Sequence, residues 1–427
     1  MARRMIWHKP LLAAAFLSAA AFWPAHAAPA ARDIPIPVAA PEEEQRFYAF
    51  LRDFRAEALN AGIMPTTYDR ATSNIHLNAR VEDLNEKQPE FVRPVWDYLA
   101  GAVSDIRVTR GKDQIALRSD LFARLQNNYG LPPEILTAIW GLETGYGQNS
   151  GTFNIFEALA TLAYDGPRVQ YARRQFIAAL KIADAEGRDP TTMTSSWAGA
   201  FGQTQFIPTT FLDNGVDGDG DGKRDVWNSP ADALASAANY LKQSGWRAGE
   251  SWGEEVRLPE GFAYDLADTD TKKSISEWAN LGVRKVSGEP LSDAAEIGTT
   301  DVAAIFLPAG YRGPVFLVRN NFNAILKYNA STSYALAIGL LSDRMRGAGG
   351  VQAGWPLDEV PLDEFGRTTL QEGLSALGFS TGGTDGVLGR QSRAAIRAYQ
   401  KARGVPADGY ATPTLLTRIL NERGSAN

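Results

Sequence analysis

The sequence contains no cysteine and very little histidine. None of the 427 residues is cysteine, and of the three histidines only His76 lies beyond residue 27. The absence of cysteine excludes disulfides, thiolate zinc sites, iron–sulfur clusters, cysteine nucleophiles and lipid anchors on cysteine. A Ser-His-Asp triad in the rest of the chain could use only His76, and a metal site with several histidines is excluded there.

An excess of positive charge is also absent. Lys and Arg together number 43 against 49 Asp and Glu, and the net charge is -6. Proteins that bind nucleic acid usually carry a basic face, so we expect no nucleic-acid partner. Apolar residues make up 44% and charged residues 22% of the chain, which is typical of a soluble globular protein. The length allows two or three domains.

Residues 1–27 have the pattern of a secretory signal peptide. A positively charged start precedes an apolar run from Leu11 to Trp23, and Ala25-His26-Ala27 fits a cleavage site. The apolar run is shorter than the roughly 20 residues that a membrane-spanning helix needs. We therefore expect export to the periplasm as a soluble protein, with no membrane span in the mature chain.

Two linkers divide the rest of the chain. Residues 28–42 are rich in Ala and Pro, and residues 346–361 are rich in Gly. Residues 43–345 show mainly helical periodicity, although the stretch 253–317 is less regular and could hold short strands. Residues 362–424 form a small separate unit. The patterns predict a mainly α protein with one large domain and one small domain.

One segment predicts a carboxylate at the end of a helix. Ile135, Ile139 and Leu142 form an apolar helical face, and Glu143 follows Ile139 by four residues on that same face. Gly145 should end the helix. Burial would keep such a side chain protonated near neutral pH, as a general acid requires. From spacing alone, a glutamate that ends the helix and points into water is the simpler interpretation.

The same residues resemble a known family. The segment LETGYG at 142–147 is similar to the catalytic signature of lytic murein transglycosylases of the B type. Other segments similar to that family stand in the expected order: 88–91 (QPEF), 96–99 (WDYL), 160–164 (ATLAY) and 196–208 (SWAGAFGQTQFIP). The resemblance covers about 43–345 and implies a lysozyme-like catalytic domain.

The resemblance implies a reaction on peptidoglycan. Such enzymes cleave the β-1,4 bond between N-acetylmuramic acid and N-acetylglucosamine without adding water, and the muramyl 6-hydroxyl closes a 1,6-anhydro ring. Glu143 matches the family's single acid and base, and the substrate N-acetyl group replaces the second carboxylate of ordinary glycosidases. The residues alone leave two alternatives open: a hydrolytic muramidase, and an inactive wall-binding scaffold.

The family resemblance also implies a sugar cleft. The positions that match its polar and aromatic lining are Ser196, Gln205, Tyr240, Tyr328, Asn329 and Tyr334. Arg168 stands where the family often has paired arginines, although its neighbour here is Val169. Tyrosine suits a sugar cleft because its ring stacks on a sugar and its hydroxyl forms hydrogen bonds. Taken singly, each of these tyrosines would be read as a core residue.

An acidic loop predicts a structural Ca²⁺ ion. We expect no organic cofactor. The sequence DGDGDG at 217–222 fits the opening of an EF-hand loop, although the twelfth position is Asn228 instead of Glu. The resemblance implies a longer loop that a later acid closes. The expected ligands are Asp217, Asp219, Asp221, the carbonyl of Lys223, and Asp232. The alternative is a solvated acidic turn without an ion.

The C-terminal unit is similar to the type-one peptidoglycan-binding domain. Its segments LQEGLSALGF (370–379) and AAIRAYQ (394–400) carry the similarity, and an Asp-Gly pair at 385–386 is echoed at 408–409. This resemblance implies a small three-helix domain that tethers the enzyme to glycan strands and raises its effective concentration at the polymer. Proteins of wall synthesis or remodelling are further candidate partners.

Overall fold

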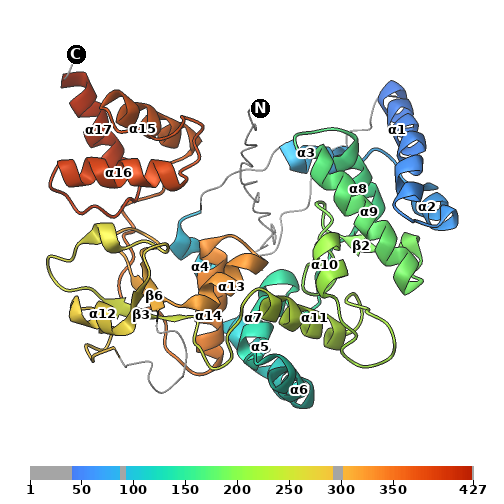
Figure 1. Ribbon diagram of the computed structural model, residues 1–427, viewed down its shortest axis with the longest axis horizontal. Helices are drawn as coiled ribbons and strands as arrows, with labels where there is room; N and C mark the ends of the chain where they lie inside the picture. The colour runs from blue at the N-terminus through green and yellow to red at the C-terminus, as the bar shows by residue number, and fades with distance from the viewer. Residues whose placement is uncertain (1–40, 87–92, 292–301, 426–427) are drawn as a thin grey trace, which may run out of the picture.

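A computed structural model describes residues 41–86, 93–291 and 302–425. The expected signal peptide, nearly all of the first linker and the segment 88–91 lie outside the described residues. Within the described parts the protein is mainly helical, with two small antiparallel sheets (Figure 1). No helix of the described parts is both long enough and apolar enough to cross a bilayer.

The largest body is helical. Its helices come from two stretches of the chain, one before and one after the strands of the five-stranded sheet. Its first helices are α1 (Pro41–Asn60), α2 (Pro65–Thr72), α3 (Ala79–Glu86), α4 (Val95–Ala102), α5 (Asp105–Leu117), α6 (Ser119–Tyr129) and α7 (Pro133–Thr144). The later ones are α8 (Ile155–Tyr164), α9 (Val169–Glu186), α10 (Pro208–Asn214), α11 (Pro230–Gln243), α13 (Asn320–Tyr328) and α14 (Thr332–Met345). Two short strands, β1 (Phe153–Asn154) and β2 (Thr194–Ser195), pair beside them.

Apolar periodicity explains how these helices pack. In α1, Phe47, Leu51, Phe54 and Ala58 recur at helical spacing, and all four are buried. They belong to one continuous core that runs as far as Met345 of α14. Because α13 and α14 complete this core, the chain leaves the helical body after α11 and returns to it seventy-odd residues later.

The intervening segment folds as a five-stranded antiparallel sheet with a core of its own. The strand order is β4-β6-β7-β3-β5. The elements are β3 (Gly253–Arg257), β4 (Lys273–Ser274), α12 (Ile275–Asn280), β5 (Arg284–Lys285), β6 (Val302–Phe306) and β7 (Val315–Val318). Trp278, Ile305 and Leu317 are fully buried in this core. The sheet thus forms a distinct unit inserted into the helical body, where sequence periodicity indicated only short strands.

The C-terminal unit consists of three helices, α15 (Glu364–Ala376), α16 (Arg390–Ala402) and α17 (Pro413–Ser425). The two Asp-Gly pairs of its sequence form two similar turns, each bound by a glutamine side chain. The Gln371 side chain binds the turn at 385–386: its Oε1 accepts from the Gly386 N–H at 2.8 Å. The Gln400 side chain binds the turn at 408–409 in the same way, and its Oε1 accepts from the Gly409 N–H at 2.9 Å. The two halves of the unit therefore use the same glutamine-to-turn clamp.

Candidate active site

Helix α7 packs against α14, α5 and α11 and carries Glu143 in its last turn. Every residue from Ile135 to Thr144 is buried, so the helix is enclosed on all sides instead of presenting one apolar face. Gly145 ends the helix with a φ of 61°, and its N–H donates to the Gly141 carbonyl at 3.2 Å. A left-handed residue at this position favours glycine. The helix therefore ends abruptly, directly after the carboxylate.

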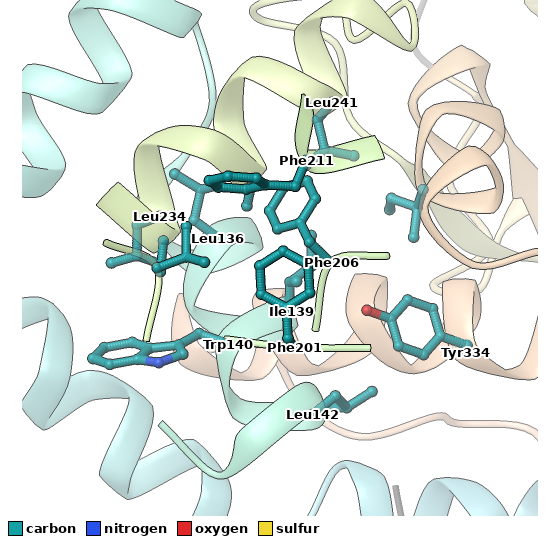
Figure 2. Packing of buried hydrophobic residues seen from close by; sticks show 14 of the residues in the cluster. Leu136, Ile139, Trp140, Leu142, Phe201, Phe206, Phe211, Leu234, Leu241 and Tyr334 are labelled. Carbon is teal, nitrogen blue, oxygen red and sulfur yellow. The ribbon is translucent and has the colours of Figure 1, made fainter. Parts of the chain in front are cut away.

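Glu143 is held by a tyrosine from the far end of the domain. Its side chain is 7% exposed, and its Oε1 accepts a hydrogen bond of 2.6 Å from the Tyr334 hydroxyl. Tyr334 lies in the first turn of α14, 191 residues away in sequence. In Figure 2 its hydroxyl points toward the centre of the packed cluster that also contains Ile139 and Phe206. Burial, followed by the charge of Glu143, holds the pKa of Tyr334 well above its usual value, so the phenol stays a donor.

Two further predicted tyrosines lie beside this pair. The Tyr328 hydroxyl donates to the Thr204 carbonyl at 2.6 Å, and the Tyr240 hydroxyl donates to the Lys327 carbonyl at 2.8 Å. Their rings lie 5.4 Å apart, centroid to centroid. Burial raises the pKa of Tyr328 well above its ordinary value, and the Glu143 charge adds to the shift, which places that phenol near the carboxylate. Both hydroxyls donate to backbone carbonyls, and these bonds orient the two neighbouring rings.

Ser196 and Gln205 lie on the loop that packs against the turn after Glu143. The Gln205 side chain donates to the Ser150 carbonyl at 3.2 Å, and its backbone has a φ of 50°, a left-handed conformation unusual outside glycine. A side chain at Gly151 would collide with the backbone of Ser195 and Ser196, so these two segments touch directly. The Ser196 Oγ accepts from the Ala200 N–H at 3.1 Å, which closes a tight turn.

The remaining predicted site residues lie at the edges of this arrangement. Asn329 is buried directly after α13, and its side chain accepts from the Ser331 N–H at 3.0 Å. It thereby shapes the turn that leads into Tyr334. Arg168 lines a small cavity together with Trp197, next to the Ser196 turn. The structure therefore places Arg168 beside the cleft loop.

Sequence reasoning missed two residues of the site. Burial, with the Glu143 charge as the second cause, raises the pKa of Tyr98 in α4, so the carboxylate acts on this phenol electrostatically. Gln203 is the second: its side chain accepts from the Trp140 indole N–H at 3.1 Å, and its carbonyl accepts from the Thr144 hydroxyl at 2.6 Å. Both residues fall inside segments that carried the family resemblance, which was the signal that could have found them.

The acidic loop gathers three of the predicted calcium ligands. Carboxylate oxygens of Asp217, Asp219 and Asp221 lie within 4.8 Å of one another, and all three residues are exposed. The N–H of Lys223 donates to Asp221 Oδ1 at 2.8 Å. Asp232 lies outside this group. Its two oxygens accept from the backbone N–H groups of Gly218 and Asp225, at 2.8 and 2.7 Å, and so brace the loop from beneath.

Comparisons with known proteins agree with this geometry. Residues 46–343 match the family described as Transglycosylase SLT domain, and residues 366–419 match that described as Putative peptidoglycan binding domain. The membrane-bound lytic murein transglycosylase B of Escherichia coli is 35% identical over 225 residues. That alignment covers 51% of this chain and 58% of the relative, so the chain spans less than two thirds of that protein's length.

Solved structures extend the similarity to nearly the whole described chain. SltB3 of Pseudomonas aeruginosa, in complex with NAG-anhNAM-pentapeptide, superposes with a TM-score of 0.84 at 48% identity, covering 87% of this chain and 99% of that one. The Escherichia coli lytic transglycosylase Slt35, in complex with calcium, has a TM-score of 0.58 at 29% identity. It covers 71% of this chain, and 93% of its own length is matched.

Fold and site together define a peptidoglycan-directed enzyme family with an attached wall-binding unit. The match over 46–343 includes more than half of the chain. The chain belongs to the transglycosylase SLT family of lytic murein transglycosylases, of the B type, and carries a C-terminal peptidoglycan-binding domain. The members of this family are lyases that act on peptidoglycan, and the lysozyme-like mainly helical fold expected from the sequence is confirmed.

Proposed function

We propose that this protein is a lytic transglycosylase that cleaves the β-1,4 bond between N-acetylmuramic acid and N-acetylglucosamine and leaves a 1,6-anhydromuramyl end. The observation that carries the proposal is the buried Glu143, bonded at 2.6 Å to a buried tyrosine hydroxyl and placed at an abrupt helix end. The complex of SltB3 with an anhydromuramyl compound supports the same reaction for a protein of 48% identity.

Glu143 would act first as the acid. Because the Tyr334 hydroxyl donates to Oε1, the proton of the neutral carboxyl resides on Oε2, from which it passes to the oxygen of the leaving N-acetylglucosamine. The C1–O bond breaks as the muramyl acetamido oxygen bonds to C1. The hydrogen bond from Tyr334 strengthens as negative charge develops on the carboxylate, which is the differential stabilisation that catalysis needs.

The same carboxylate would then act as the base. It takes the proton of the muramyl 6-hydroxyl, whose oxygen attacks C1 and releases the acetamido oxygen. The cycle returns Glu143 to its protonated form, and no water is consumed. The neighbouring rings of Tyr240 and Tyr328 would offer faces on which a sugar stacks, and the loop of Ser196 and Gln205 would offer polar contacts.

The acidic loop would hold a structural Ca²⁺ ion. Three carboxylates within 4.8 Å of one another repel unless a cation lies between them, and hard oxygen ligands suit Ca²⁺. Slt35, a structural relative, is known in complex with calcium. In this chain the ligands would be Asp217, Asp219, Asp221, the carbonyl of Lys223, and Asp232.

Domain limits and location complete the proposal. The catalytic domain would occupy 43–345 and the wall-binding domain 362–424, joined by the linker at 346–361. The pattern of residues 1–27 supports export to the periplasm, where peptidoglycan lies. Glycan strands would be the partner of both domains.

Turnover of purified peptidoglycan by the wild type and by Glu143→Gln tests the assignment. Glutamine keeps the size of the side chain and its bond from Tyr334 but cannot deliver a proton. We expect the release of soluble fragments to fall by at least about a hundredfold, as for the loss of a general acid, while sedimentation with peptidoglycan is unchanged. Equal release by both proteins would refute Glu143. A wild type that binds the polymer and releases nothing would indicate the scaffold instead.

A further inference from the structure

The C-terminal domain is docked on the sheet by complementary charge. Arg390, Arg397 and Lys401 lie at spacings of seven and four residues, and therefore on one face of α16. They pair with Asp270, Asp268 and Asp265 of the sheet unit, and the Lys401–Asp265 distance is 2.9 Å. The Arg397–Asp268 pair, at 2.6 Å, is the least exposed, with side chains 18% and 23% exposed. Exposed pairs contribute little, so this central pair should carry most of the docking energy.

A second contact fixes the turn of the C-terminal domain that contains Asp408. Asp408 Oδ1 accepts from the Gln400 side chain at 2.7 Å and from the Tyr410 N–H at 3.0 Å, whereas Oδ2 accepts from the Tyr311 N–H at 2.9 Å. The last of these bonds joins two domains. Gly310 is required here, because a side chain on it would collide with Asp408. Among the described residues, the hydrogen bonds of the equivalent turn at 385–386 stay within the C-terminal domain, so this turn contact belongs to the second half of the repeat.

A pocket of about 220 Å³ lies where these domains meet. One wall comes from residues 309–312 of the sheet unit, another from residues 400–418 of the C-terminal domain, and Pro356 and Glu359 of the linker complete it. Its lining combines aromatic and aliphatic groups, including Tyr311, Tyr410 and Leu415, with charged groups. Because both domains supply walls, the pocket exists only in the docked arrangement.

We propose that this pocket binds the free end of a peptidoglycan stem peptide. The inference rests on the proposed function, since it deepens the recognition of the same polymer. Arg418 is exposed on α17 where that helix lines the pocket, and it offers a guanidinium to a terminal carboxylate. Glu359 of the linker also lines the pocket, where Arg312 donates to its Oε1 at 3.4 Å. The apolar walls suit the small methyl groups of alanine residues.

The shape of the polymer favours a peptide over a sugar. A glycan strand continues in both directions and needs a groove open at each end, whereas a stem peptide is a side branch with a free end that can enter a pocket. The volume is below the roughly 300–1,000 Å³ of sites that enclose whole small ligands, which suits a chain end. Docking would thus let the enzyme hold a peptide while the glycan lies elsewhere on its surface.

Fluorescence anisotropy of a labelled stem peptide tests the inference on the full chain. The probe is L-Ala–γ-D-Glu–meso-diaminopimelate–D-Ala–D-Ala with the dye at its N-terminus, where the muramyl group is attached in the wall. We expect wild type to bind it, and Arg418→Ala to weaken binding at least tenfold. Arg423→Ala removes another exposed arginine of the same helix, away from the pocket, and should bind as wild type does. Amidation of the peptide's terminal carboxylate should weaken binding as strongly as Arg418→Ala.

A charge-reversal pair tests the need for docking. Asp268→Arg places like charges opposite Arg397, so this variant should lose peptide binding and increase its radius of gyration in small-angle scattering. The double variant Asp268→Arg/Arg397→Asp restores opposite charges and should recover both properties. Retention of peptide binding by an undocked Asp268→Arg chain would overturn the requirement for both domains.

Three other outcomes would overturn the inference. They are the absence of peptide binding by wild type at millimolar concentration, equal weakening by Arg418→Ala and Arg423→Ala, and displacement of the probe by chitotetraose, which would indicate a sugar site. Cleavage of peptide-free glycan strands separates this inference from the proposed function. If that cleavage persists while no peptide binds, only the inference fails.

Discussion

Removal of the Tyr334 hydroxyl should impair catalysis and leave the fold intact. Tyr334→Phe keeps the ring in its buried position and deletes only the 2.6 Å bond to Glu143. A hydrogen bond to a charged group contributes about 1.5–3 kcal/mol, and each 1.36 kcal/mol corresponds to about a tenfold change in rate. Since the bond is strongest when Glu143 carries charge in the transition state, we expect kcat to fall roughly tenfold to a hundredfold.

The assay is the initial rate of turnover of a defined glycan tetrasaccharide, with the melting temperature as the measure of stability. Tyr68→Phe is a matched control, because the Tyr68 hydroxyl is also buried and donates at 2.6 Å, but to the Leu51 carbonyl at the α1–α2 contact. We expect Tyr68→Phe to lower stability by about 0.5–1.5 kcal/mol with kcat unchanged. A Tyr334→Phe enzyme within twofold of wild type in kcat would refute the role given to this bond.

Three further changes should have separable effects. Gly147→Ala forces a side chain onto a residue with a φ of 82° and into Gln203, and should lower the free energy of unfolding by about 1–2 kcal/mol, measured by urea denaturation. Calcium at a hundred times its dissociation constant should raise the free energy of unfolding of the wild type by about 2.7 kcal/mol. Calorimetry of the double variant Asp217→Asn/Asp219→Asn should show no such gain. An equal gain in the variant would contradict the metal site. Gln371→Leu breaks the clamp on the first Asp-Gly turn, so melting of the C-terminal domain should shift down while glycan cleavage is unaffected.

The sequence predicted the helices that have one apolar face more readily than the enclosed helix of the site. In α1 the spacing of Phe47, Leu51 and Phe54 matches their burial. In α7 the spacing of Ile135 and Ile139 suggested one buried face, yet every residue from Ile135 to Thr144 is buried. Periodicity carries little information about a helix that is enclosed on every side, so the burial of Glu143 depended on the family resemblance.

The sheet unit was predicted only in outline because its strands are short and pair across long loops. β4 and β5 have two residues each, too few for alternation to be recognised. β4 pairs with β6 through contacts such as Lys273 with Ala303, and β5 pairs with β3 through Lys285 and Val256; these partners are distant in sequence. The local sequence pattern of a strand does not identify the distant strand with which it pairs.

The sequence predicted which residues belong to the site, but it did not predict the hydrogen bonds between them. The resemblance brought Tyr334 into the cleft, but only the fold reveals that its hydroxyl bonds Glu143. Asp232 is expected as a ligand, and only the fold reveals that its oxygens also accept hydrogen bonds from backbone N–H groups of the loop. The left-handed backbone of Gln205 depends on the packing of the loop around it, and glutamine has no intrinsic preference for that conformation.

The mass of the soluble products is the most direct test of the central claim, that one buried glutamate cleaves the glycan without water. The measurement is mass spectrometry of fragments that the wild type releases from purified peptidoglycan, with Glu143→Gln as the blank. The account predicts muramyl ends in the 1,6-anhydro form, absent from the blank. Fragments heavier by one water would contradict it and identify a hydrolytic muramidase on the same fold.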